Sequence, residues 1–294
     1  MLSPGDFYAL AAGFFWSFSV ILMRISGFTI PPLPLTFFKS FIAILGFFAV
    51  LIFVGDPLWP TYDSMTWLRL VVSAILGISI ADTMFAAALN RLGASLQALA
   101  DCIYAPSIAF VGFLLFGESL SAWELIGGAL VVSGVFVGMI RTKEIEDPRD
   151  LVIGTILAAG SHIIMAFGIL MVRDVIREGS LAWIAGFRFA VATLALAVYA
   201  LIRGEGKSLA MGFQMRESWK HTIPMALLGP FLATLCWIAG FKYITAGRAA
   251  IYNQMSTVFI ILLAWLILRE KMTVRKTVGV ALAISGALLV GMSG

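Results

Sequence analysis

The sequence predicts an all-α membrane protein, with ten transmembrane helices arranged as two inverted five-helix repeats around a central cavity. Hydrophobic residues make up 61% of the chain and charged residues only 12%, whereas soluble domains have roughly 45–50% and about 25%. The apolar residues fall in runs of about 20, the length that lets a helix cross the hydrocarbon core of a bilayer. A long stretch of the sequence also occurs twice.

The repeated stretch covers residues 90–139 and 242–291, which align without a gap at a shift of 152. The clearest matched pairs are Ala94 with Ala246, Glu118 with Glu270, Gly127 with Gly279, Ser133 with Ser285 and Gly134 with Gly286. Phe38-Lys39 also matches Phe187-Arg188, at a shift of 149. We therefore expect two related units, residues 1–143 and 144–294, each a five-helix repeat.

Ten apolar runs define the predicted spans. They are residues 6–25, 34–54, 67–89, 95–116, 121–140, 151–172, 181–202, 219–241, 248–268 and 274–292. Proline has no backbone N–H, so Pro31 and Pro32 end the first span and Pro57 and Pro60 follow the second. Two charged links, Arg141–Asp150 and Arg203–His221, separate later spans. Since each half holds an odd number of spans, the second half must enter from the opposite face of the membrane, as in many transporters.

Basic residues predict the orientation. The turn 117–124 contains no Lys or Arg, whereas its counterpart 269–276 contains several. Lys and Arg collect on the cytoplasmic side, which places 269–276 in the cytoplasm and both termini outside. The residues that oppose this orientation are Arg69, Arg173, Arg177, Lys242 and Arg248.

Composition and motifs exclude several classes of protein. The net charge of +4 resides in loops that meet lipid headgroups, so we expect a lipid bilayer and no nucleic acid as partner. Cys102 and Cys236 lie in apolar runs and indicate no disulfide framework. The N-terminus lacks the basic region of a cleavable signal peptide, so the first run is expected to be a retained helix. Zinc-protease, P-loop and nucleophile-elbow motifs are missing from the sequence, so we expect no enzyme, no catalytic residue, no cofactor and no metal.

Several short motifs resemble those of a known superfamily. They are Trp16-Ser17, the basic pair Lys39 and Arg188, Leu76-Gly77, and Gly117-Glu118 with Gly127. With the tandem five-helix halves, these resemble the drug/metabolite transporter superfamily and, within it, the EamA-type exporters. The second half departs from the pattern, because Arg269-Glu270 stands where the family often has Gly-Glu.

A closer similarity comes from residues 14–19 and 100–106, which resemble the bacterial aromatic amino acid exporters. This resemblance implies efflux of aromatic and other neutral amino acids by alternating access across the bacterial inner membrane. The alternative is a multidrug or organic-cation exporter, since two intramembrane acids in an aromatic-walled cavity would suit a cation; an intramembrane enzyme ranks behind both. The expected partner is a small molecule, and the expected assembly is a monomer or homodimer.

Polar residues inside the spans are the candidate binding residues. Gln97, Asp101 and Tyr104 share one helix face, and their repeat counterparts are Ala249, Asn253 and Ser256. Such a stripe lines a hydrated cavity or, alternatively, joins helices by hydrogen bonds. The same choice applies to Asp82, which could instead pair with Lys39 or Arg91, and to His162, which suits proton handling or a substrate carboxylate.

Aromatic residues supply the remaining candidates. Trp16 and Ser19 share a face of the first span, and Trp237 lies in the eighth; aromatic walls suit a large apolar side chain or a cation, although ordinary packing would explain them too. The predicted substrate-binding set is Trp16, Ser19, Asp82, Gln97, Asp101, Tyr104, His162, Trp237, Asn253 and Ser256. Lys39 and Arg188 are expected to reach towards the interface, and Glu118 and Glu270 to cap or tie their turns.

Overall fold

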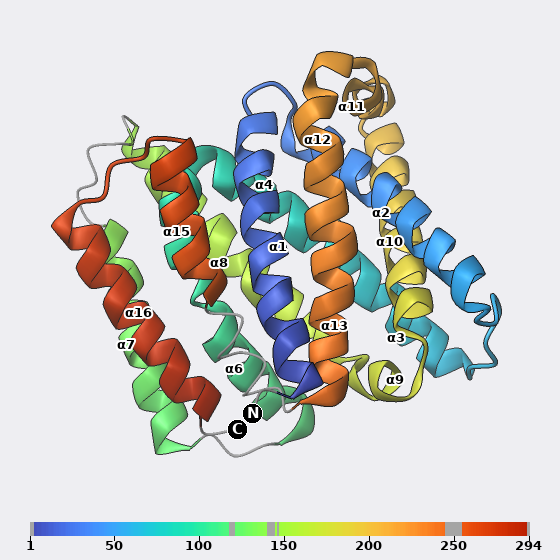
Figure 1. Ribbon diagram of the computed structural model, residues 1–294, viewed down its shortest axis with the longest axis horizontal. Coiled ribbons are helices and arrows are strands. Elements are labelled where there is room, and N and C mark those ends of the chain that lie inside the picture. Colours follow the sequence, from blue (N-terminus) through green and yellow to red (C-terminus); the bar gives the residue numbers. More distant parts are fainter. Residues whose placement is uncertain (1–2, 118–120, 140–144, 146, 245–254, 293–294) are drawn as a thin grey trace.

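A computed structural model describes residues 3–117, 121–139, 145, 147–244 and 255–292, and every regular element in those ranges is a helix (Figure 1). Seven helical stretches there are long and apolar enough to cross a membrane. They are Pro4–Ser26, Pro32–Val54, Ser64–Leu92, Ala94–Phe116, Pro148–Leu170, Leu181–Ile202 and Arg216–Gly240. Two shorter apolar helices are Leu125–Gly138 and Met255–Ile267. The predicted all-α, multi-pass membrane class is confirmed, while the count of ten spans stays a prediction.

The elements follow the predicted spans closely. In the first half they are α1 (Pro4–Ser26), α2 (Pro32–Val54), α3 (Ser64–Ala74), η1 (Ile75–Ile80), α4 (Ala81–Leu92), α5 (Ala94–Asp101), α6 (Tyr104–Phe116) and α7 (Ala122–Met139). In the second half they are α8 (Pro148–Leu170), α9 (Arg173–Glu178), α10 (Leu181–Ile202), η2 (Gly206–Ala210), α11 (Met211–Gln214), η3 (Arg216–Ser218), α12 (Trp219–Ala226), η4 (Leu227–Ala233), α13 (Thr234–Tyr243), α15 (Met255–Ile267) and α16 (Val274–Met292).

Helix ends lie where capping residues occur. Ser3 and Asp6 form a capping box at the start of α1, with the Ser3 N–H donating to the Asp6 carboxylate at 2.7 Å. Asp63 caps α3 by accepting from the Thr66 N–H at 2.5 Å. That hydrogen bond holds the pKa of the Asp63 carboxyl below its ordinary value.

The charged link 203–221 contains short helices that the sequence did not predict. Phe213 of α11 packs edge-on against Phe38 of α2, with ring centroids 4.9 Å apart. The Trp219 indole N–H donates to the Gly212 carbonyl at 3.1 Å. These apolar residues fold the link back onto the bundle, because they bury against α2 in spite of the charges around them.

Helices of the two halves pack against each other throughout. The extensive pairings between the halves include α1 with α12, η4, α13 and α15, α2 with α10, α4, α6 and η1 with α8, α5 with α15, and α7 with α16. The pair α7 and α16 stands at one side of the molecule (Figure 1). A methyl group on Gly134 would lie 2.5 Å from the Gly279 carbonyl oxygen, so glycine is what allows these two backbones to approach.

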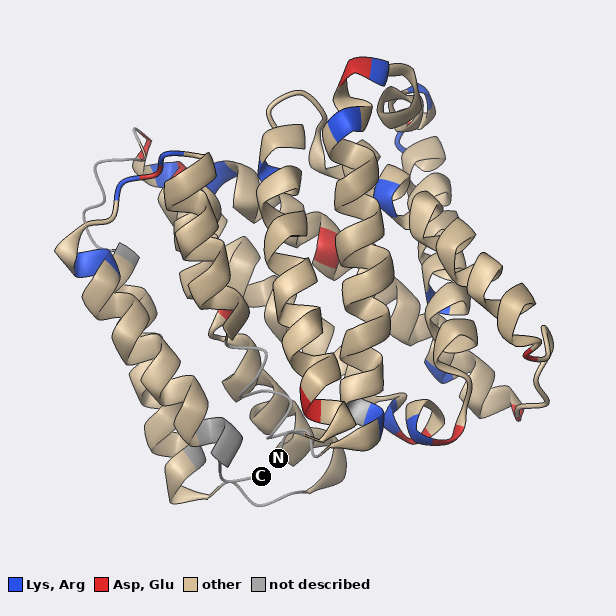
Figure 2. Ribbon diagram, viewed as in Figure 1, with Lys and Arg blue, Asp and Glu red and all other residues tan. Residues whose placement is uncertain are grey.

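Apolar side chains cover the outside, and charges gather at the helix ends. Large exposed hydrophobics recur on α2, α6, α7, α10 and α15, as expected of a surface in contact with lipid. Figure 2 shows Lys, Arg, Asp and Glu mostly towards the two ends of the bundle, with few charges midway. The midway charges are therefore the ones that need a structural or functional reason.

Two π-helical segments lie at equivalent places in the two halves. These are η1 and η4, whose first residues, Ile75 and Leu227, are 152 positions apart, the same shift as the sequence repeat. A π-helix is rare and frequently marks a functional site. Both segments lie beside the central cavity, which η1 reaches through Gly77 and η4 through Pro230.

Candidate functional site

A cavity of about 140 Å³ lies between the two halves. Its lining residues come from helices of both halves: Ala12, Trp16, Lys39, Gly77, Ile78, Asp82, Asp101, Tyr104, His162, Met165, Arg188, Phe189, Pro230, Ala233, Thr234, Trp237, Ser256 and Thr257. The volume is below the roughly 300–1,000 Å³ of drug-sized sites. The wall combines aromatic rings, two carboxylates and two long basic side chains, so the cavity has both apolar and strongly polar surfaces.

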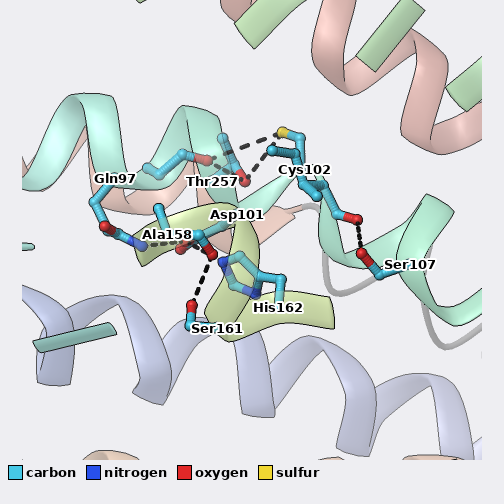
Figure 3. A network of polar contacts seen from close by, with 10 residues as sticks. Gln97, Asp101, Cys102, Ser107, Ala158, Ser161, His162 and Thr257 are labelled. Atoms are coloured by element: carbon cyan, nitrogen blue, oxygen red, sulfur yellow. Dashed lines mark hydrogen bonds and ion pairs between the residues drawn. The ribbon is translucent and has the colours of Figure 1, made fainter. Parts of the chain in front are cut away.

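Asp101 is the centre of one polar network in the cavity wall. The His162 Nε2 atom lies 2.8 Å from Asp101 Oδ1, and the Gln97 amide donates to the same oxygen at 2.9 Å. Figure 3 shows the side chains of Gln97 and His162 converging on Asp101. Gln97 and Asp101 come from successive turns of α5 and His162 from α8, so the network joins the two halves. It holds the Asp101 carboxylate in one orientation.

A second contact anchors α5 to α15. The Thr257 hydroxyl donates to the Ala98 carbonyl at 3.3 Å, and the Cys102 sulfur lies 3.8 Å from that hydroxyl (Figure 3). Cys102 is a buried free thiol, and Cys236 is also free. This contact fixes the register of α5 against the second half, and therefore the height at which Asp101 enters the cavity.

Lys39 forms a buried ion pair with Asp82 in the cavity wall. The expectation that Lys39 reaches the interface is wrong, because only 1% of its side chain is exposed. Its charge is stabilised inside the protein by Asp82, which η1 and α4 bring opposite α2. Of the two partners proposed for Asp82, Lys39 is the one observed, while Arg91 pairs with Asp150 at 3.3 Å.

Arg188 is also buried rather than extended to the interface, with 4% of the residue exposed. It lies on α10 and lines the same cavity. Its Nε–H group is buried without a hydrogen-bond partner in the described part of the chain. Unlike Lys39, it has no ion-pair partner among the described residues, although Asp82 acts on it electrostatically from further away.

Aromatic rings form the apolar part of the wall. Trp16 packs on Phe85 with centroids 5.5 Å apart, and Tyr104 lies 6.4 Å from Trp237 and 6.1 Å from the His162 ring. The Tyr104 hydroxyl is buried without a hydrogen-bond partner in the described ranges. Trp16 and Trp237 offer an apolar ligand group an aromatic surface in this cavity.

The predicted set falls into three groups. Those that line the cavity are Trp16, Asp82, Asp101, Tyr104, His162, Trp237 and Ser256. Two others are buried behind the lining: Ser19 donates to the Met225 carbonyl at 2.8 Å, and Gln97 orients Asp101. Asn253 lies outside the described residues.

Sequence reasoning missed Lys39 and Arg188 as cavity residues. The signal was present, since both occupy equivalent positions of the repeat. Within the described ranges, no group of His, Cys, Asp and Glu side chains is arranged to hold a metal ion.

A second, larger hollow of about 580 Å³ lies beside α9. Its wall includes Asp56, Tyr62, Glu178 and Lys242, and the Lys242 ammonium donates to the Gly179 carbonyl at 3.2 Å. Helix α13 contributes to both spaces, with Trp237 in the central cavity and Lys242 in this outer hollow.

A helical membrane protein with a charged, aromatic-walled cavity between two interleaved halves has the features of a membrane transporter. The model of the EamA-like transporter family matches residues 3–140 and again residues 152–292. The chain therefore belongs to the EamA-like transporter family, as its motifs predicted.

Two curated relatives are similar to the chain. It is 29% identical over 110 residues to an uncharacterized transporter of Archaeoglobus fulgidus, a match that covers 36% of each chain. It is 20% identical over 237 residues to an uncharacterized transporter of Methanothermobacter thermautotrophicus, covering 78% of this chain and 65% of the relative. The matched regions thus span less than two thirds of either relative.

A crystal structure of another protein has the same fold. It matches with a TM-score of 0.70 and 19% identity, over 98% of this chain and 96% of the other.

Proposed function

We propose that this transporter exports amino acids, aromatic and other neutral ones, across the bacterial inner membrane by alternating access through the central cavity. One observation carries the proposal: the small cavity presents charges of both signs beside aromatic rings. An amino acid is a zwitterion with a variable side chain, so it needs an anionic group, a cationic group and an apolar wall in one place. We also propose that residues 1–143 and 144–294 act as inverted repeats around this cavity.

The charges in the wall favour a zwitterion over an organic cation. Asp82 is paired with Lys39, which leaves Asp101 and Arg188 as the remaining acid and base. With a neutral His162 the two opposite charges match a zwitterion, and with a protonated His162 the cavity carries net positive charge. In neither state does the cavity carry a net negative charge that would favour a cation over a zwitterion, and the volume of about 140 Å³ also favours a small substrate.

Further support comes from the family and from resemblance. The chain belongs to a transporter family, and residues 14–19 and 100–106 resemble the bacterial aromatic amino acid exporter YddG. Similarities at this level do not name a substrate, so the amino acid assignment depends on the cavity chemistry described above.

Transport by purified protein in proteoliposomes tests the proposal. Vesicles are loaded with unlabelled phenylalanine, methionine or threonine, and entry of the labelled amino acid in exchange is measured with and without a pH gradient. We expect saturable exchange above that of protein-free vesicles. Movement of an aromatic dication with no movement of any of the three amino acids would replace the proposal with the organic-cation alternative.

A further inference from the structure

We infer that Arg188 and Tyr104 together bind a carboxylate group of the transported substrate. This inference deepens the proposed function and depends on it for the location of the substrate. It assigns one end of the ligand to two side chains that face the same cavity from different halves of the chain, Tyr104 on α6 and Arg188 on α10.

The first argument is the state of the Arg188 charge. A buried cation is strongly destabilising without a nearby anion and hydrogen-bond acceptors. Arg188 is 4% exposed, and within the described ranges its Nε–H has no acceptor and the side chain has no ion-pair partner. Because Arg188 lines the cavity, an acceptor inside that space could reach its guanidinium.

The second argument is a difference between the two halves. Lys39 and Arg188 are matched cations, and Lys39 has Asp82 as its counter-ion. At the shift of 152, Asp82 falls on Thr234, which is uncharged and also lines the cavity. The first half thus supplies an anion for its own cation, and the second half has a hydroxyl at that place. A substrate carboxylate would fill the role that Asp82 has in the first half.

The third argument is the position of Tyr104. Tyr104 lines the cavity, and its hydroxyl is buried with no hydrogen-bond partner in the described ranges. Arg188 lines the same cavity. A phenol donates one hydrogen bond and a guanidinium donates several in a planar fork, a combination that suits the two oxygens of a carboxylate.

Gly77 makes room for this geometry. A methyl group on Gly77 would lie 3.0 Å from Arg188 Nη2, so the guanidinium is packed against the bare backbone of η1. This contact restricts the orientation of the fork. Lysine would keep the charge but lose the planar two-point contact, so Arg188→Lys is a specific test of a carboxylate.

The closing experiment compares four phenyl-bearing ligands, two with a carboxylate and two without one. Binding of phenylalanine, phenylalanine amide, phenethylamine and 3-phenylpropionate to detergent-purified protein is followed by tryptophan fluorescence, with Trp16 and Trp237 in the cavity wall as reporters. In the wild type we expect the two carboxylates to bind more tightly than the two ligands without one.

Arg188→Gln is expected to weaken binding of the two carboxylate ligands by about 10- to 100-fold and to leave phenethylamine within about twofold. Arg188→Lys should recover part of the affinity, and Tyr104→Phe should lose about tenfold for carboxylates only. Arg203→Gln is the matched control, because that side chain is 62% exposed at the end of α10. A thermal melt of each variant verifies folding.

Equal loss for all four ligands, or no loss of carboxylate binding in Arg188→Gln, would overturn the inference. So would a wild type that binds neither carboxylate. If the wild type binds 3-phenylpropionate through Arg188 while proteoliposomes move no amino acid, the proposed function fails and the carboxylate site stands.

Discussion

The Glu270 carboxylate accepts a hydrogen bond from the backbone N–H of Ala94 at 2.8 Å, across the boundary between the two halves. Its second oxygen accepts from the Ser95 N–H, also at 2.8 Å. The turn after α15 thereby caps the start of α5 in the other half, whereas the sequence led us to expect that this glutamate would cap or tie its own turn. Beside it, the Arg24 guanidinium donates to the Leu89 and Asn90 carbonyls at the end of α4. Gly93 separates α4 from α5, and side-chain hydrogen bonds thus hold the helix end before it and the helix start after it.

Glu270→Gln should lower the stability of the protein. An amide has one acceptor oxygen, so one of the two α5 N–H groups loses its partner, and the negative charge at the helix N-terminus disappears. We expect a loss of about 1 kcal/mol, measured as a lower Tm in detergent. Lys271→Gln is the matched control, since its exposed side chain lies next to Glu270. An unchanged Tm in Glu270→Gln would show that the cap contributes no stability.

Arg269→Gly should raise the stability. Arg269 has φ of 56°, a left-handed conformation that is unfavourable for a residue with a Cβ, while its repeat counterpart Gly117 has φ of 66°. Glycine removes a strain of about 1 kcal/mol, partly offset by the greater freedom of the unfolded chain. The readout is Tm in detergent, with Lys271→Gly expected to show no gain. A lower Tm for Arg269→Gly would contradict the assignment of strain.

Replacing either Lys39 or Asp82 alone should destabilise the protein strongly. Each change leaves an unpaired charge in the interior, at a cost of about 3–5 kcal/mol. The double variant Lys39→Met/Asp82→Leu should recover most of that stability, because it removes both charges together. A double-mutant cycle of Tm values measures the coupling, and additive losses would rule out a direct pair.

Asp101→Asn should reduce amino acid exchange by about tenfold or more while the protein stays folded. The amide keeps the shape of the side chain but removes the charge that faces His162. Gln97→Ala should have a smaller effect, since Gln97 lies behind the lining and only orients Asp101. Near-normal exchange by Asp101→Asn would make this residue part of the scaffold.

Single cysteines at Ser121 and Lys271 should react from opposite sides of the membrane. The two sites precede α7 and α16, which are expected to be repeat-equivalent helices that cross in opposite directions. The experiment uses a background in which Cys102 and Cys236 are replaced by alanine, and a membrane-impermeant maleimide applied to one face at a time. Labelling of both sites from the same face would exclude the inverted repeat.

Much of this architecture could be predicted from the sequence. Runs of apolar residues give the helices, and an acid within such a run, such as Asp82 or Asp101, must face protein or water. The burial of Lys39 and Arg188 could not be predicted in the same way. Each lies near a helix start, where a long side chain often reaches the interface. In the structure α2 packs against α10 and η1 packs against α8. This packing keeps the Lys39 and Arg188 side chains from reaching the interface.

The predicted site also contained residues that do not face the cavity. Ser19 and Gln97 share a helix face with cavity residues. Helical spacing predicts the face on which a residue lies, but not whether its side chain reaches the cavity. Ser19 is used to bond a carbonyl of α12, and Gln97 to hold Asp101. Distinguishing a lining residue from one directly behind it requires the position of the neighbouring helix, which depends on long-range contacts.

The π-helical turns of η1 and η4 have a mechanical consequence. A turn of α-helix takes 3.6 residues, so one residue more or less in a turn rotates everything beyond it by about 100°. Asp82 is the second residue after the end of η1, and Thr234 is the first residue after η4. A change of either wide turn to α-helical winding would swing that side chain to another face of its helix. Each half therefore contains a point midway along a span at which a change of helical winding would reorient a polar side chain while the chain remains helical.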